Sequence, residues 1–169
     1  MHRHTISVLV ENKFGVLARV AGMFSGRGFN IHSVNVGPSH NPEISRMTLV
    51  VNAKDDRVVD QIIKQLDKLV DVIQVIDFRE GESVEREMVL LQIEVDSRIR
   101  AEVIELCDIF RAKIIDVSTR VLTIEITGDE GKVNKFILLM THFGIKDLTR
   151  TGKIALPKAD GLEREIIST

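Results

Sequence analysis

The stretch NKFGVLARVAGMFSGRGFNIHSVNVG, residues 12–37, decides how the first half of this chain folds. Before it, residues 5–11 alternate between apolar and polar side chains, which indicates a half-buried strand. After Gly15 the apolar period becomes helical, and residues 31–36 return to the alternation of a strand. Gly26 and Gly28 can end the helix between them. The apolar stripe predicted for this helix consists of Leu17, Val20, Ala21 and Phe24.

The glycine turn that opens the predicted helix has the features of an anion site. A helix N-terminus presents unpaired N–H groups and a partial positive charge, which favour a carboxylate or a phosphate. Gly15 has no side chain, so a ligand can approach the backbone closely. Asn12 and Asn30 flank the helix at its two ends, and their amides can donate to and accept from a small zwitterion. The alternative is that Gly15 is only a turn glycine and the two Asn residues are caps.

The rest of the first half completes a known topology. A loop with two prolines leads to an alternating strand over residues 43–52, and residues 72–78 form a β-branched run suited to a further strand. Between them, Asp55 or Asp56 can cap a helix. The apolar positions of that helix are Val59, Ile62, Ile63, Leu66 and Val70. The resulting order βαββαβ is the ferredoxin-like arrangement.

A polar stretch, REGESVER over residues 79–86, predicts a domain boundary. We expect an N-terminal domain over residues 1–79 and a C-terminal domain over residues 80–169. The second half repeats the element order, with a helix that Ser97 can cap, a later helix after Asp129 and a weaker final strand within residues 145–156. The sequence therefore predicts an α+β fold of two ferredoxin-like βαββαβ units, with antiparallel sheets and helices on one face.

Composition and motifs exclude several functions. The chain has 169 residues, is 44% hydrophobic and 28% charged, and carries a net charge of -2, which gives no electrostatic reason to expect nucleic acid or an anionic membrane. No apolar run approaches the roughly 20 residues that span a bilayer, and the N-terminal MHRHTISVLVE lacks the features of a signal peptide. We therefore expect a cytoplasmic protein with neither nucleic acid nor membrane as a partner.

No catalytic or metal site is predicted from the residues. The chain has no P-loop, its five histidines form no metal-binding motif, and no pair of carboxylates indicates an acid/base dyad. RNA-recognition modules of this topology stack bases on sheet aromatics, and this chain has no Tyr or Trp. The single cysteine, Cys107, lies on an apolar helical face four residues after Val103, which favours a buried structural thiol.

Each half is small for a stable domain. A domain of this size buries only about 60% of its unfolded surface, and a four-stranded sheet leaves open edges that invite pairing with another chain. We therefore expect a homodimer.

The first half resembles an ACT domain through VLVENKFGVLARVAGMFSGRGFNIHSVNVG, SRMTLVV and QLDKLVDVIQV. It is more closely similar to the regulatory small subunit of acetolactate (acetohydroxyacid) synthase, and VEREMVLLQIEV and IFRAKIIDVS extend this resemblance over nearly the whole chain. The resemblance implies a non-catalytic protein that activates a separate catalytic large subunit. It also implies feedback inhibition by valine in the biosynthesis of valine, isoleucine and leucine.

The resemblance also implies where the effector binds. In this family the effector lies between two ACT domains, so the N-terminal domain would both bind valine and dimerise. Carried over by position, the effector-binding residues are Asn12, Gly15, Val16, Leu17, Asn30 and Ile31.

No cofactor is implied for this chain, because thiamine diphosphate, magnesium and FAD are expected only on the catalytic partner. One alternative is an ACT-type amino-acid sensor that serves a different enzyme or a transcriptional regulator. Another is a small enzyme, because ferredoxin-like folds host many functions.

Overall fold

The computed structural model of the chain describes residues 2–78 and 82–160. Contacts between Cα atoms divide the chain into two compact units, Met1–Val84 with Lys153–Thr169, and Glu85–Gly152. The predicted boundary between residues 79 and 80 lies outside the described residues. Each unit has a hydrophobic core of its own.

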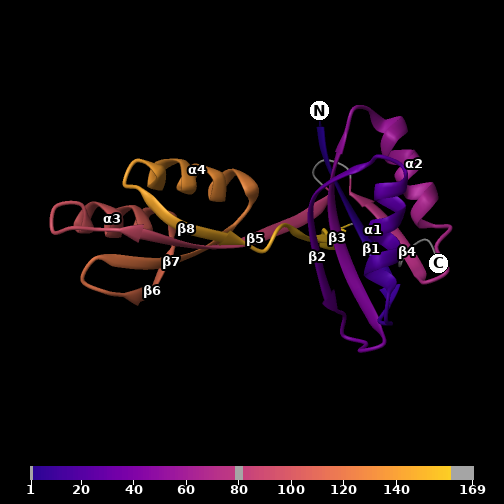
Figure 1. The fold of residues 1–169 in the computed structure, drawn as a ribbon, viewed down its shortest axis with the longest axis horizontal. Helices are drawn as coiled ribbons and strands as arrows, with labels where there is room; N and C mark the ends of the chain where they lie inside the picture. Colours follow the sequence, from indigo (N-terminus) through magenta and orange to yellow (C-terminus); the bar gives the residue numbers. More distant parts are fainter. Residues whose placement is uncertain (1, 79–81, 161–169) are drawn as a thin grey trace. The chain divides into compact units, whose positions relative to one another are not determined.

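The first unit has the predicted βαββαβ order (Figure 1). Its four strands form one antiparallel sheet in the order β2-β3-β1-β4, so β2 and β4 are the edge strands. The elements are β1 (His2–Glu11), α1 (Val16–Gly26), β2 (Asn30–Pro38), β3 (Ile44–Ala53), α2 (Asp56–Leu66) and β4 (Val72–Phe78).

The core of the first unit corrects the predicted stripe of α1. The helix buries Val16, Val20 and Phe24, whereas the side chain of Leu17 is 49% exposed and Ala21 is exposed. Gly15 is the N-cap, so Val16 is the first helical residue and its face, one residue earlier than predicted, packs against the sheet. One predicted member of the α2 stripe is wrong: α2 ends at Leu66, and Val70, four residues further on, is exposed.

Helix α1 ends where the glycines predict. Gly26 is its last residue, and Gly28 has a φ of 68°, a conformation that glycine adopts without a Cβ clash. The N–H of Phe29 donates to the carbonyl of Phe24 at 3.1 Å, and the N–H of Gly28 donates to that of Ser25 at 3.3 Å. These two bonds form a Schellman motif, and the rings of Phe24 and Phe29 meet edge to face with centroids 6.2 Å apart.

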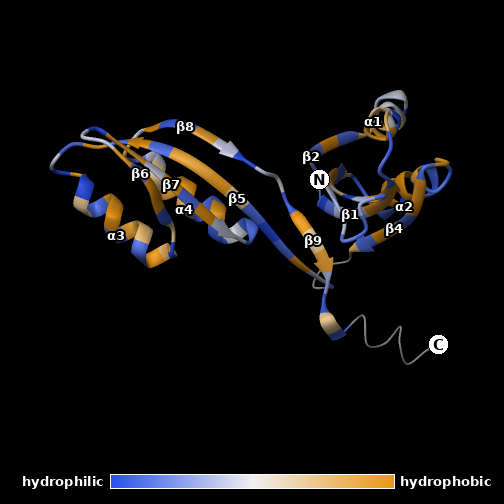
Figure 2. Ribbon diagram, turned by 90° about the horizontal axis from the view of Figure 1, so that it is seen from below, coloured by the Kyte–Doolittle hydropathy of each residue, from blue (hydrophilic) through white to orange (hydrophobic). Residues whose placement is uncertain are grey.

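The second unit repeats the topology, as predicted. Its sheet has the order β6-β7-β5-β8, and the short strand β9 also pairs with β5. Figure 2 shows hydrophobic residues along the middle of β5, where Val89, Leu91 and Ile93 are buried in the core. The elements are β5 (Ser83–Glu94), α3 (Arg100–Phe110), β6 (Lys113–Val117), β7 (Val121–Gly128), α4 (Glu130–Thr141) and β8 (Ile145–Arg150). The short strand β9 (Ile154–Pro157) and the first two residues of β5 are assigned to the first unit.

One local prediction for the second half is wrong, and two further features of it were not predicted. The polar stretch over residues 79–86 contains both the division between the units, after Val84, and the start of β5 at Ser83, which was not predicted. Ser97 does not cap α3, which begins at Arg100 without a side-chain cap bond from the described residues; the Oδ1 of Asp96 instead accepts hydrogen bonds from the N–H groups of Arg98 and Ile99 in the turn before the helix. The range predicted to contain a final strand, residues 145–156, contains β8 and the start of β9, and β9 belongs to the first unit together with β1, which it contacts.

Candidate functional site

The turn between β1 and α1 leaves the start of the helix without a side-chain cap. Gly15 is the N-cap and has a φ of 81°, in the left-handed region that favours glycine. The first turn of α1 contains no acidic residue, and no side-chain cap bond is made there by the described residues. By contrast, Asp55 caps α2 and Asp129 caps α4. The N–H of Val16 donates to the carbonyl of Lys13 at 3.5 Å, so the N–H groups of Leu17 and Ala18 are the ones available to an anionic ligand.

Neither predicted asparagine acts as a helix cap. The Nδ2 of Asn12 donates to the carbonyl of Pro42 at 2.8 Å, and its N–H donates to that of Glu43 at 2.7 Å. Asn12 thus ties the turn to the loop between β2 and β3. Asn30 is the first residue of β2 and lies opposite Asn52 of β3. The alternative interpretation was that Gly15 is a turn glycine and the two Asn residues are helix caps. Its first part is confirmed and its second part is wrong.

The structure places the six predicted effector residues at two opposite ends of one sheet. Asn12, Gly15, Val16 and Leu17 follow the end of β1, where Glu11 pairs with Ile44. Asn30 and Ile31 begin β2, and Asn30 pairs with Asn52, which also pairs with Arg3 at the start of β1. The eight residue-to-residue steps from Arg3 to Glu11 span about 26 Å in a strand. A single chain therefore does not bring the two groups together.

The predicted residues also differ in what they can offer a ligand. Val16 is only 3% exposed and belongs to the core, so its side chain cannot contact a ligand, and its N–H donates to the carbonyl of Lys13 at 3.5 Å. Leu17 is half-exposed and can contribute an apolar contact. Ile31 is partly buried against the core at the start of β2.

An ion pair beside the turn was not predicted from the sequence. The Nε of Arg19 donates to Oδ2 of Asp71 at 2.6 Å, and its Nη2 lies 3.4 Å from the carbonyl oxygen of Phe14. The Nη1 of Arg19 would lie 3.0 Å from a Cβ added at Gly15. Long side chains on a helix point toward its N-terminus, so the spacing from Gly15 to Arg19 was an available signal. Asp71 is 52 residues from Arg19 and gave no such signal.

The other basic residue of the turn is already paired. Lys13 forms an ion pair with Glu11 at the surface. The hydrogen bond and the charge of Glu11 raise the pKa of the Lys13 ammonium group above its ordinary value. Lys13 therefore stays charged at neutral pH, next to a carboxylate of opposite charge.

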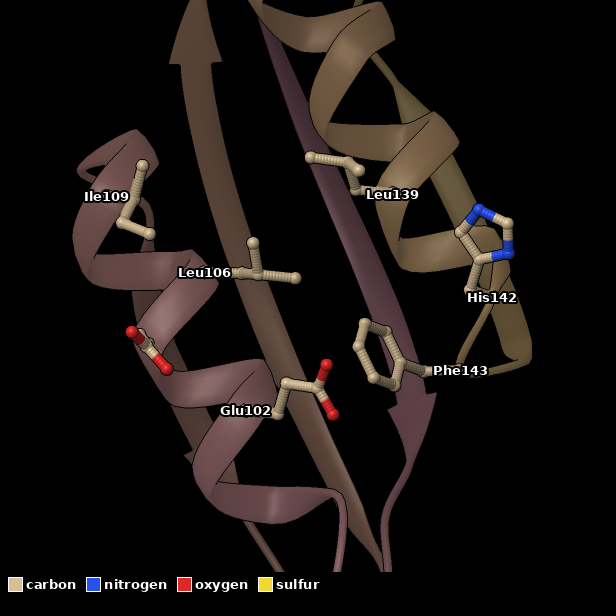
Figure 3. A pocket seen from close by; sticks show the side chains of 7 residues that line it. Glu102, Leu106, Ile109, Leu139, His142 and Phe143 are labelled. Atoms are coloured by element: carbon tan, nitrogen blue, oxygen red, sulfur yellow. The ribbon is translucent and has the colours of Figure 1, made fainter.

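A pocket in the second unit contains none of the predicted residues in its lining. It has a volume of about 440 Å³ and lies between α3 and α4 (Figure 3). Its lining combines four apolar side chains with two carboxylates and one imidazole. The lining residues are Glu102, Glu105, Leu106, Ile109, Leu139, His142 and Phe143.

Neither a metal cluster nor a membrane span occurs in the part of the chain that the structure describes. Among residues 2–78 and 82–160, no three His, Cys, Asp or Glu side chains are grouped to hold a metal ion. None of the helices within those ranges is long and apolar enough to cross a membrane.

Cys107 is buried in the core of the second unit, as predicted. Burial, with a smaller effect from the charge of Asp108, raises the pKa of its thiol to about 11. We expect the folded protein to resist alkylation by iodoacetamide at pH 8, because the thiolate is the nucleophile, and to react once unfolded in urea. Since the folded thiol keeps its proton longer, stability should fall as pH rises from the ordinary value of 9.0 toward about 11. Rapid labelling of the folded chain at pH 8 would contradict this.

Comparisons with known proteins agree with this architecture. Residues 6–74 match the family model of the AHAS small subunit-like ACT domain, and residues 86–159 match that of the small subunit of acetolactate synthase. Two ferredoxin-like units, the first of them an ACT domain, define a protein of the ACT-domain regulatory class.

The similar proteins share one description. The chain is 54% identical to the probable acetolactate synthase small subunit of Archaeoglobus fulgidus, over 94% of this chain and 98% of that one. It is 44% identical to the acetolactate synthase small subunit of Aquifex aeolicus, over 98% of this chain and 86% of that one. The crystal structure of the acetolactate synthase small subunit from Thermotoga maritima superposes with a TM-score of 0.87 at 42% identity. The superposition covers 94% of this chain and 98% of that one. The chain therefore belongs to the family of acetolactate synthase small subunits, which are regulatory subunits of that enzyme.

Proposed function

We propose that this chain activates the catalytic large subunit of acetolactate synthase and makes it sensitive to feedback inhibition by valine. One observation carries the proposal: the small-subunit family match includes an ACT domain whose first helix begins at an uncapped glycine turn. The match over both units favours this enzyme over a different enzyme or a transcriptional regulator as the target.

Valine fits the chemistry of the turn between β1 and α1. Its carboxylate would accept hydrogen bonds from the first N–H groups of α1, where Gly15 lets it approach. Its ammonium group needs an oxygen acceptor, which an Asn side chain can supply. Its isopropyl group would lie against the exposed side chain of Leu17 or the partly buried Ile31.

A homodimer would bring the two groups of predicted residues together. Pro38, at the end of β2, pairs with Ser45, which also pairs with Val10 near the end of β1. The end of β2 therefore lies at the same end of the sheet as the Gly15 turn. If the edge strands β2 of two chains pair antiparallel, Asn30 of each chain lies toward the Gly15 turn of the other. This geometry supports an effector site formed by both chains.

In this proposal the catalytic subunit carries out the reaction. Thiamine diphosphate, magnesium and FAD would be held by the catalytic subunit, and this chain would contribute regulation alone. The cell compartment expected for the complex is the cytoplasm.

Reconstitution of the enzyme tests the proposal. We expect the purified chain alone to form no acetolactate from pyruvate, and to raise the turnover of the catalytic subunit when the two are mixed. Valine added to the mixture should then lower the turnover toward that of the catalytic subunit alone. Acetolactate formation by the pure chain, or no change in turnover on mixing, would overturn the proposed function.

A further inference from the structure

Arg19 places a positive charge where a helix disfavours one. The N-terminal end of a helix carries a partial positive charge, which favours acidic residues and disfavours basic ones. The guanidinium of Arg19 nevertheless lies over the N-cap of α1, with its Nη1 3.0 Å from the position of a Gly15 Cβ. The first turn of α1 has no acidic residue to offset it.

Asp71 holds this guanidinium in one orientation. The Asp71 side chain is only 10% exposed, and its backbone oxygen accepts the N–H of Glu11 at 2.9 Å, so the loop before β4 is tied to the end of β1. Asp71 binds Nε of Arg19, and the two Nη groups lie at the Gly15 turn, where Nη2 donates to the carbonyl of Phe14 at 3.4 Å and Nη1 lies 3.0 Å from the position of a Gly15 Cβ. The Arg19 side chain is 48% exposed, so a solute can reach it.

We propose that Arg19 is a direct ligand of the effector carboxylate and that Asp71 is the residue that positions it. This inference rests on the proposed function, in which an amino acid binds at this turn. Arginine binds carboxylates through two parallel N–H donors, and such charge-assisted bonds are stronger than bonds from neutral N–H groups. The carboxylate would lie between the Nη groups of Arg19 and the N–H groups of α1, and it would pair with the Nη side of a guanidinium that Asp71 contacts through Nε.

The proposal defines the class of effector. The ligand must carry a free α-carboxylate, because an uncharged amide offers no negative charge to Arg19. Valinamide, which keeps the ammonium and isopropyl groups of valine, is therefore the matched probe.

The experiment is calorimetric titration of the full chain with valine and with valinamide. We expect Arg19→Gln to weaken valine binding by about 10- to 100-fold, because one charge-assisted pair is lost. Asp71→Asn should weaken it less, since the guanidinium remains but is no longer held. The control is Arg57→Gln, which removes an exposed arginine from the first turn of α2 and should leave valine affinity unchanged.

A purely structural role for the ion pair predicts a different pattern. In that case Arg19→Gln would lower the melting temperature but would keep the ratio of valine affinity to valinamide affinity. We expect that ratio to fall in Arg19→Gln, and Asp71→Asn to have no further effect on it in the Arg19→Gln background. Arg19→Lys keeps the charge without the two-donor geometry, so it should bind valine with intermediate affinity and serves if Arg19→Gln does not fold.

The experiment distinguishes a failure of the proposed function from a failure of the role proposed for Arg19. If the unmodified chain binds no valine, the proposed function fails at this turn. If the unmodified chain binds valine and Arg19→Gln binds it equally tightly, with an unchanged ratio to valinamide, only the role of Arg19 is overturned.

Discussion

Replacement of Gly15 by aspartate is expected to abolish or strongly weaken inhibition by valine while the catalytic subunit is still activated. A carboxylate about 4 Å from that of the ligand repels it by about 1 kcal/mol in water and about 4 kcal/mol at an effective dielectric of 20. These values correspond to a loss of affinity between about 5-fold and several hundred-fold. The new carboxylate would also lie beside the guanidinium of Arg19, where it would compete with the effector for the same cation.

A matched control separates charge from backbone strain. Gly15 has a φ of 81°, so any other side chain there adds strain of about 1 to 2 kcal/mol. Gly15→Ala carries the same strain without the charge, and we expect both variants to melt at a lower temperature than the unmodified chain. Valine titrations of reconstituted enzyme then compare their half-inhibitory concentrations. If Gly15→Asp is inhibited by valine like the unmodified chain, the carboxylate of the effector does not bind at this turn.

The fold was predictable because local patterns carry most of it. Alternation before Glu11 and the helical period after Gly15 place β1 and α1, and the aspartates at 55 and 129 start α2 and α4 as predicted. The face of α1 was misjudged by one residue, because Val16 and Leu17 are both apolar and only packing decides which one is buried. The start of β5 at Ser83 was not predicted, because the first residues of this strand are mostly polar and the apolar alternation begins only later in it.

The candidate site was less predictable, because it depends on contacts between distant parts of the chain. The sequence indicated Gly15 and the start of α1, which are local features. It did not indicate Asp71, whose pairing with Arg19 depends on where the loop before β4 lies. Nor did it indicate that Asn12 and Asn30 lie at opposite ends of the sheet, since that follows from strand register.

Because the Gly15 turn and Asn30 lie at opposite ends of the sheet, a site shared between two chains can be tested directly. Gly15→Asp damages the turn but keeps Asn30, whereas Asn30→Ala keeps the turn and removes the amide that the other chain would contribute. We expect neither variant to bind valine well as a homodimer. In a heterodimer of the two, one site would combine both changes, and the other would combine an intact turn with an intact Asn30.

The measurement is the number of valine molecules bound per heterodimer, purified through a different tag on each variant and titrated by calorimetry. A site formed by two chains predicts one valine per heterodimer, bound as tightly as by the unmodified protein. Absence of such binding in the heterodimer, or undiminished binding by the Asn30→Ala homodimer, would contradict a site shared between the Gly15 turn of one chain and the β2 strand of the other.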